Sequence, residues 1–195
     1  MRITGGIHRG RVLEAPGGRQ VRPTSDRVRE ALFSILGARL DGARVLDLFA
    51  GSGALGLDAL SRGATSCRFV EEDRRVCDLI RRNIASLGLE ERCDVVRGDA
   101  FSPTVAPSGS DGPFDLVLID PPYRMTADVT PVTSVGRLLT RLWVEGIVDV
   151  PAGLVVLEHD RRARIDETWE HFVISDTRTY GDTSLTFMTG IDADE

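Results

Sequence analysis

The strongest constraint on the fold is a short run of residues whose pattern predicts a strand, a tight turn and a helix in succession. Residues 45–49 are apolar except for Asp47, and a helical pattern begins at residue 54, after Ala50, Gly51, Ser52 and Gly53. Glycines at positions 51 and 53 permit positive φ angles and a close approach of the backbone to a ligand, and the free N–H groups of the following helix point at the same place. We therefore expect a polar, partly charged ligand at this turn.

The glycine spacing narrows the class of ligand without fixing it. Gly51, Gly53 and Gly56 match the pattern GxGxxG, and Glu71 follows Gly51 by 20 residues, at the end of a second strand-like run. Nicotinamide, flavin and S-adenosylmethionine sites share this arrangement. A glycine turn that only packs a helix on a sheet is the structural alternative.

A second motif separates these possibilities. Residues 114–119 form another buried-strand pattern that runs directly into Asp120, Pro121, Pro122 and Tyr123. Two consecutive prolines restrict the backbone, so the Asp120 side chain and nearby carbonyls are held at the carboxyl end of a strand, where open α/β sheets bind ligands. An oxidoreductase has no obvious use for this set of groups, whereas a methyltransferase acting on a base amine does.

Strand-like and helical segments alternate along most of the chain. Strands are predicted at 43–49, 66–70, 93–97, 114–119 and 153–157, and helices at 54–62, 73–87 and 135–145. This alternation predicts an α/β Rossmann-like fold, a mostly parallel sheet with helices on both faces. Two alternating segments, 171–180 and 183–189, are expected to close the sheet as an antiparallel pair.

The segments between these elements carry further predictions. A helix capped by Thr24 or Ser25 is expected to end at Gly37 and to bury the stripe Val28, Ala31, Leu32, Ile35 and Leu36. Residues 102–113 are rich in Ser, Pro and Gly and predict a flexible surface loop. Residues 124–134 are polar and unpatterned, which suggests a lid beside the site.

Composition excludes several classes of protein. The 195 residues are 42% hydrophobic and 28% charged, as expected for one globular domain. No apolar run approaches the length of a membrane span and no signal peptide is evident, so we expect a cytoplasmic protein. Cys67, Cys77 and Cys93 lack disulfide or metal-ligand spacing, which predicts reduced thiols and no metal site. Nothing in the sequence indicates a large apolar interface, so a monomer is expected.

Charge is distributed unevenly. The net charge is −6, but residues 1–30 hold seven arginines against three acidic residues, a local +4, so the rest of the chain carries −10. A basic patch on an acidic body is typical of a nucleic-acid contact. We predict that residues 1–22 form a basic β-hairpin extension of the main domain, residues 23–195, and that nucleic acid is contacted by Arg2, His8, Arg9, Arg11, Arg19, Arg22 and Thr24.

With these motifs in view, the chain resembles the RsmD family of bacterial methyltransferases, which modify the exocyclic N2 amine of a guanine in 16S ribosomal RNA. The resemblance rests on RPTSDRVREALFSIL, VLDLFAGSGALGLDALSRGA, FVEEDR, the turn at Gly98 and Asp99, and DPPY. It implies the class I methyltransferase fold with a seven-stranded sheet, S-adenosyl-L-methionine as cofactor, and 16S rRNA in the small ribosomal subunit or an assembly intermediate as partner. It also implies that the nucleic acid contacted by the basic extension is RNA and that residues 23–195 are a methyltransferase domain.

The resemblance also implies roles for individual residues. The cofactor would be held by Asp47, Phe49, Ala50, Gly51, Ser52, Gly53, Glu71, Glu72, Asp99 and Ala100. The flipped guanine would be held by Asp120, Pro121, Pro122 and Tyr123, with Asp120 and the Pro121 carbonyl accepting hydrogen bonds from the amine and Tyr123 stacking on the base. Glu71 is favoured over Glu72 and Asp73 for the ribose hydroxyls, because it is the first residue past the apolar run.

Other functions share parts of this pattern. An adenine-N6 methyltransferase acting on DNA or RNA would use the same residues 120–123. A nucleotide-cofactor oxidoreductase would share the glycines and Glu71, and a non-catalytic RNA-binding module would bind RNA without transferring a methyl group.

Overall fold

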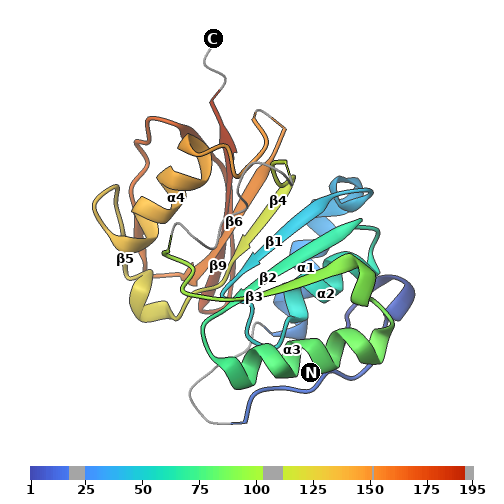
Figure 1. The fold of residues 1–195 in the computed structure, drawn as a ribbon. Helices are drawn as coiled ribbons and strands as arrows, with labels where there is room; N and C mark the ends of the chain where they lie inside the picture. Colours follow the sequence, from blue (N-terminus) through green and yellow to red (C-terminus); the bar gives the residue numbers. More distant parts are fainter. Residues whose placement is uncertain (18–24, 103–111, 151, 192–195) are drawn as a thin grey trace. The chain divides into compact units, whose positions relative to one another are not determined.

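The computed structural model describes residues 1–17, 25–102, 112–150 and 152–191 and divides the chain into two compact units, Met1–Ala100 and Phe101–Glu195. The strands belong to one seven-stranded mixed sheet with the order β3-β2-β1-β4-β6-β9-β8 and to one two-stranded sheet of β5 and β7. The predicted α/β, mostly parallel, Rossmann-like sheet is confirmed (Figure 1). No helix among the described residues is long and apolar enough to cross a membrane.

The described residues of the first unit form three parallel strands and three α-helices. The strands are β1 (Arg44–Leu48), β2 (Ser66–Glu71) and β3 (Cys93–Arg97), and β2 pairs with both of the others. The helices are α1 (Asp26–Leu36), α2 (Ala54–Ser61) and α3 (Arg74–Leu87), and short 3-10 turns lie at η1 (Gly6–His8), η2 (Gly37–Leu40) and η3 (Glu90–Arg92).

Local sequence signals set the helix ends in this unit. The Ser25 hydroxyl accepts a hydrogen bond from Val28 N and caps α1, which ends at Gly37 as predicted. The Asp73 carboxylate accepts from Arg75 N and Val76 N at the start of α3, and Gly88 ends that helix in a left-handed conformation. Thr24, the other candidate cap, and the predicted contacts Arg19 and Arg22 lie outside the described residues.

The buried face of α1 differs from its predicted stripe. Val28, Leu32 and Leu36 are buried as expected, but Ile35 is 43% exposed. Arg29 and Phe33 take its place on the buried side, because a carboxylate on α2 compensates the Arg29 charge.

The second unit contains the remaining strands and α4 (Ser134–Val144). Strands β4 (Leu116–Ile119) and β6 (Leu154–Asp160) are parallel, and β9 (Thr183–Gly190) is antiparallel to both β6 and β8 (Phe172–Tyr180). The predicted antiparallel strand pair around Gly181 is therefore confirmed. Most of the predicted flexible loop, residues 103–111, lies outside the described part of the chain.

The predicted lid has more structure than its sequence suggested. Residues 123–125 form the 3-10 turn η5, and β5 (Asp128–Val129) pairs in parallel with β7 (Arg164–Ile165). Thr126 and Val129 are fully buried. The polar appearance of this stretch was misleading, because a strand of two residues is too short to show a period.

Candidate functional site

The glycine turn after β1 has the backbone that its sequence predicted. Gly51 and Gly53 have φ angles of 55° and 78°, and Phe49, with a φ of 62°, has the only positive φ among the described non-glycine residues. A bulky residue in this region is strained, and such strain gathers at ligand sites. A Cβ added at Gly51 would have a single neighbour within 4 Å, the Phe49 carbonyl oxygen at 3.9 Å, so the space over the turn is open there.

Helix α2 is held close against the sheet behind this turn. A Cβ added at Gly56 would lie 2.4 Å from Phe69 Cε1 and 2.5 Å from Cys67 Sγ, so only glycine fits. The buried Asp47 carboxylate accepts a hydrogen bond from Gly56 N at 2.9 Å. This contact gives Asp47 a part in fixing the start of α2, and its predicted contact with the cofactor stays a prediction.

Glu71 points at the glycine turn. One carboxylate oxygen accepts a hydrogen bond from Gly51 N and the other from Asp73 N, both at 3.0 Å. The two other candidates for the contact with the ribose hydroxyls are placed differently, since Glu72 is exposed and Asp73 caps α3. Gly98 N donates to the Glu71 carbonyl, which brings the turn with Asp99 and Ala100 beside the end of β2.

The N-terminal segment, residues 1–14, is fastened to α2 and α3. It is a narrow ribbon closed by η1, in which Ile3 N donates to Arg11 O and Leu13 N donates to Met1 O. In Figure 1 this dark blue segment runs along α3. The predicted basic residues Arg2, Arg9 and Arg11 are exposed, and His8 is half-buried.

A buried ion network holds this segment to two helices. Asp58 on α2 accepts from Thr4 N at 2.8 Å, Thr4 Oγ1 at 2.9 Å and Arg29 Nε at 3.1 Å, and the Arg29 and Asp58 side chains are both fully buried. Burial raises the pKa of the Asp58 carboxyl, although the Thr4 hydrogen bond and the Arg29 charge act to lower it. Arg2 extends the network by pairing with Asp26, which also binds Arg29.

Asn83 on α3 connects the N-terminal segment to the glycine turn. Its side-chain oxygen accepts from Glu14 N at 2.8 Å, and its amide nitrogen donates to the carbonyls of Glu14 and Ser52, both at 3.0 Å. Asn83 is 2% exposed. Sequence reasoning missed this residue, and only its polar side chain on the buried side of an amphipathic helix could have signalled it.

The second unit carries the acid–proline–proline–tyrosine run at the end of β4. Asp120 is half-buried, Pro121 is buried and Pro122 is exposed. The Tyr123 hydroxyl lies 2.7 Å from Thr183 Oγ1 and donates to Glu158 Oε1 at 3.4 Å. Both partners lie on strands of the sheet, so hydrogen bonds to the Tyr123 hydroxyl group fix the position of the aromatic ring. Glu158, 5% exposed, is a further residue that the sequence analysis did not single out.

A separate groove of about 720 Å³ runs along α4 in the second unit and contains none of the predicted site residues. Its floor is the stacked pair Trp169 and Phe172, with ring centroids 4.6 Å apart. Arg141 and Glu145 on its rim lie 3.7 Å apart and offset each other's charge. Because neither the glycine turn nor residues 120–123 line this groove, it is not the candidate site.

The cysteines fit the predicted reduced state. All three are free, and burial raises the pKa of the Cys67 thiol well above its usual range and that of Cys93 to about 12. Thiols with such pKa values are poor nucleophiles and poor metal ligands at neutral pH.

Comparison with known proteins decides the family. The family described as "Conserved hypothetical protein 95" matches residues 1–189. The chain belongs to this family, the RsmD family. Among curated relatives, "Putative rRNA methyltransferase YlbH" of Bacillus subtilis (strain 168) is 36% identical over 185 residues, which cover 95% of this chain and 96% of that protein.

Other members of the RsmD family agree with this assignment. "Ribosomal RNA small subunit methyltransferase D" of Escherichia coli (strain K12) is 45% identical over 124 residues, 64% of this chain and 61% of that protein. The solved structure "Putative methyltransferase yhhF from Escherichia coli" superposes with a TM-score of 0.76 at 31% identity and covers 97% of both chains. The fold is therefore that of the class I methyltransferases.

Proposed function

We propose that this protein uses S-adenosylmethionine to methylate the exocyclic N2 amine of a guanine in 16S rRNA of the small ribosomal subunit. The single observation that carries the proposal is the run Asp120, Pro121, Pro122 and Tyr123 at the carboxyl end of β4, with the Tyr123 hydroxyl anchored on two neighbouring strands. Names of RsmD-family relatives support an rRNA substrate.

The residues of the first unit fit the proposed cofactor. The strained turn at Phe49, the open space over Gly51 and the carboxylate of Glu71 suit a ligand with a charged amino-acid part and a ribose diol. Ala50, Ser52 and Gly53 belong to the same turn and Asp47 lies in β1 just before it, while Glu72, Asp99 and Ala100 follow the ends of the next two strands. When bound, S-adenosylmethionine supplies a methyl group on a positively charged sulfur.

The residues of the second unit would position the target amine. A guanine N2 lone pair is delocalised into the ring and is a weak nucleophile. The Asp120 carboxylate and the Pro121 carbonyl each accept one N–H of the amine, which concentrates the lone pair on nitrogen, and Tyr123 stacks on the extruded base. The amine nitrogen would take the methyl group as the bond between that group and the cofactor's sulfur breaks, which leaves a neutral thioether. The cationic product would then release its extra proton to water, without a strong base. Positioning of this kind supplies up to roughly 7–11 kcal/mol in favourable intramolecular reactions.

The N-terminal segment would contact the RNA. Arg9 and Arg11 are exposed on its ribbon, and Ile7 and Val12 are each 78% exposed beside them. Arginine side chains suit phosphates and apolar side chains suit unstacked bases. We include Arg2, His8, Arg19, Arg22 and Thr24 in this contact, and we treat residues 1–22 as an RNA-contacting extension of the methyltransferase domain.

The test is a methylation assay on small subunits from a strain that lacks the enzyme, with labelled S-adenosylmethionine and identification of the modified nucleoside. N2-methylguanosine is the expected product. N6-methyladenosine would replace the proposal with the adenine reaction, and absence of label despite cofactor binding would refute it.

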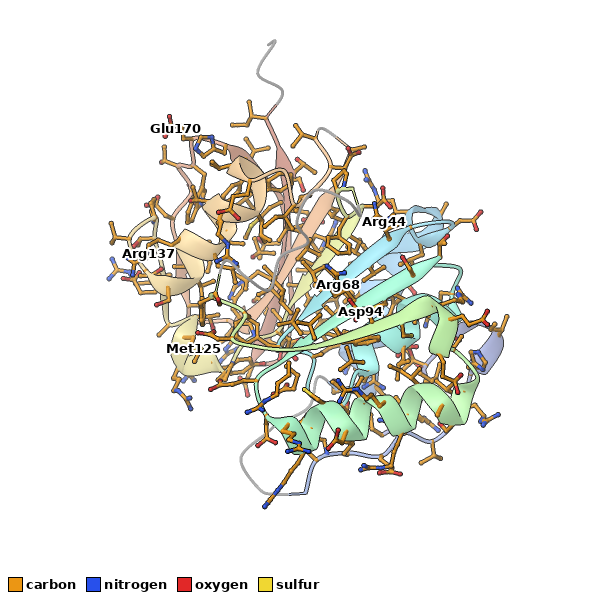
Figure 2. The ribbon with its side chains drawn as sticks, viewed as in Figure 1. Arg44, Arg68, Asp94, Met125, Arg137 and Glu170 are labelled. Carbon is orange, nitrogen blue, oxygen red and sulfur yellow. The ribbon has the colours of Figure 1, made fainter. Side chains whose placement is uncertain are left out.

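A pair of variants tests the role of Asp120. Asp120→Ala should lower turnover by about 10²-fold or more, as loss of one preorganised polar contact does, and should leave cofactor affinity within a few-fold. The matched control is Glu170→Ala, because the Glu170 side chain is 88% exposed in the same unit (labelled in Figure 2). Unchanged turnover of Asp120→Ala would remove this residue from the mechanism.

A further inference from the structure

Arginines are concentrated at one place in the acidic second half of the chain. Residues 101–195 contain seven arginines and sixteen acidic residues, and four of the seven are Arg124, Arg161, Arg162 and Arg164. A local group of cations on a strongly acidic body marks a contact with an anion or a polyanion. The proposed RNA contacts at residues 1–24 do not include any of these side chains.

The small β5–β7 sheet joins the two segments that carry these arginines. Arg164 N donates to Ala127 O at 3.1 Å, and Asp166 N donates to Val129 O at 2.9 Å. Residues 123–126 directly precede β5, and Thr126 N donates to Tyr123 O at 3.1 Å. Arg124 lies in the turn η5 with Tyr123 and Met125, which Figure 2 labels, and Arg164 pairs with the strand that follows this turn.

The turn between β6 and β7 is fixed by its own hydrogen bonds. The Asp160 side chain accepts from Arg162 N at 2.8 Å, the Asp160 carbonyl accepts from Ala163 N at 2.9 Å, and Arg161 N donates to Asp182 O at 2.9 Å. A fixed backbone lowers the entropy that is lost when a ligand binds. The turn is therefore an ordered platform for its side chains.

Three of the four guanidinium groups have no ion-pair partner among the described residues. Arg161 pairs with Asp182 at 3.6 Å, whereas Arg124, Arg162 and Arg164 are exposed and make no ion pair within the part of the chain that the structure describes. Several carboxylates lie nearby: Asp160, which holds the turn, Asp182, which pairs with Arg161, Asp166, which follows β7, and the exposed Asp128, the register partner of Arg164. These acids weaken the local field, so this surface alone should hold RNA only weakly.

We propose that Arg124, Arg162 and Arg164 form a second RNA-binding surface, which contacts backbone phosphates next to the target nucleotide. This inference rests on the proposed function, since it takes Tyr123 as the residue that stacks on the target base. Each guanidinium offers a planar set of donors that matches phosphate oxygens. The phosphates that flank an extruded base lie next to it along the backbone, and arginines beside the stacking residue would hold them.

The experiment compares two double variants of equal charge change. The variant Arg162→Glu/Arg164→Glu reverses the charge of two arginines of the proposed surface. The control, Arg137→Glu/Arg178→Glu, reverses the charge of two exposed arginines elsewhere in the same unit. Binding of labelled small subunits from a strain that lacks the enzyme is measured between about 50 and 200 mM salt, where phosphate contacts dominate the salt dependence. S-adenosylmethionine affinity is measured in parallel.

We expect the test variant to bind small subunits more weakly and to lower the slope of log affinity against log salt by about 1.5, or 0.7–0.9 for each lost phosphate contact. Its cofactor affinity should match that of the wild type, which shows that it folds, and the neutral variant Arg162→Gln/Arg164→Gln should show an intermediate loss. An unchanged slope, or an equal loss in the control, would overturn the proposal. A product other than N2-methylguanosine would refute the proposed function while leaving this binding result intact, so the two failures are distinguishable.

Discussion

Removal of the Asp58 carboxylate should destabilise the first unit strongly. In Asp58→Ala, Arg29 loses its 3.1 Å ion pair while its side chain has no exposure to water, although it keeps the ion pair with Asp26 at 2.9 Å and the hydrogen bond to the Arg2 carbonyl. Loss of one member of a buried ion pair costs about 3–5 kcal/mol. Since Arg29 keeps one carboxylate, we expect a fall of about 3 kcal/mol in the free energy of unfolding, at the lower end of that range.

The same substitution should release the N-terminal segment. Thr4 N and Gly5 N, which donate to Asp58 at 2.8 and 3.3 Å, would stay buried without an acceptor unless the ribbon detached. Each unsatisfied buried donor costs about 1–3 kcal/mol, so detachment is the cheaper response. Amide hydrogens of residues 1–8, the part of the ribbon next to α2, should then exchange faster than in the wild type.

The assay must report on the correct unit. Both tryptophans, Trp143 and Trp169, belong to the second unit, so their fluorescence does not follow the first. Urea unfolding followed by far-UV circular dichroism, with hydrogen exchange of the N-terminal peptides, is the suitable measurement. The control Asp78→Ala breaks a half-exposed pair with Arg81 and should change stability by less than about 1 kcal/mol. A loss below about 1 kcal/mol in Asp58→Ala, with unchanged exchange, would refute the reasoning.

The free energy of unfolding should also depend on pH through the titration of Asp58. Burial raises the folded-state pKa above the ordinary 3.8, so the folded chain holds this proton more tightly than the unfolded chain. The resulting stability is fully present below pH 3.8 and is lost as the pH rises through the folded pKa. Asp58→Asn should remove this contribution to the pH dependence of unfolding, and an unaltered profile would contradict the assignment.

Three further predictions concern the glycine turn and the second unit. Gly56→Ala should lower the free energy of unfolding by about 1–3 kcal/mol, because the added methyl group overpacks against Phe69. An unfolding free energy equal to that of the wild type would contradict this prediction and would show that the sheet moves to make room. Asn83→Ala should lower S-adenosylmethionine affinity several-fold by releasing Ser52, and isothermal titration giving an unchanged Kd would contradict this. Burial lowers the pKa of His159, so the folded state should lose stability as the pH falls below 6.5 towards the folded pKa; urea unfolding of His159→Gln should lack this slope.

Sequence patterns predicted the fold wherever a single segment carried its own signal. Helix α1 begins after Ser25 and ends at Gly37, and α3 begins after Asp73 and ends at Gly88. These ends were predictable because capping residues act within one turn of the helix. The burial of Arg29 could not be predicted in this way, since its carboxylate partner lies 29 residues later on another helix.

The same distinction between local signals and distant contacts applies to the candidate site. The glycine turn and residues 120–123 were predictable, since each has a distinctive local composition. Asn83 and Glu158 were missed because their hydrogen-bond partners are distant in sequence. The partners of Asn83 are 31 and 69 residues away, and Tyr123 is 35 residues from Glu158. Polar side chains that act through distant contacts have no periodic signal of their own.

The N-terminal segment also has a consequence for synthesis of the chain. Its anchors follow it by 54 residues at Asp58, 69 at Asn83 and 75 at Ser86. At about 5–20 residues per second, ribosomes need roughly 3–15 s to make that stretch, and the basic ribbon lacks its contacts with α2 and α3 for this interval. A nascent chain stalled before Asn83 would keep residues 9–14 open to proteases and chaperones, although the rest of the ribbon could already bind α2.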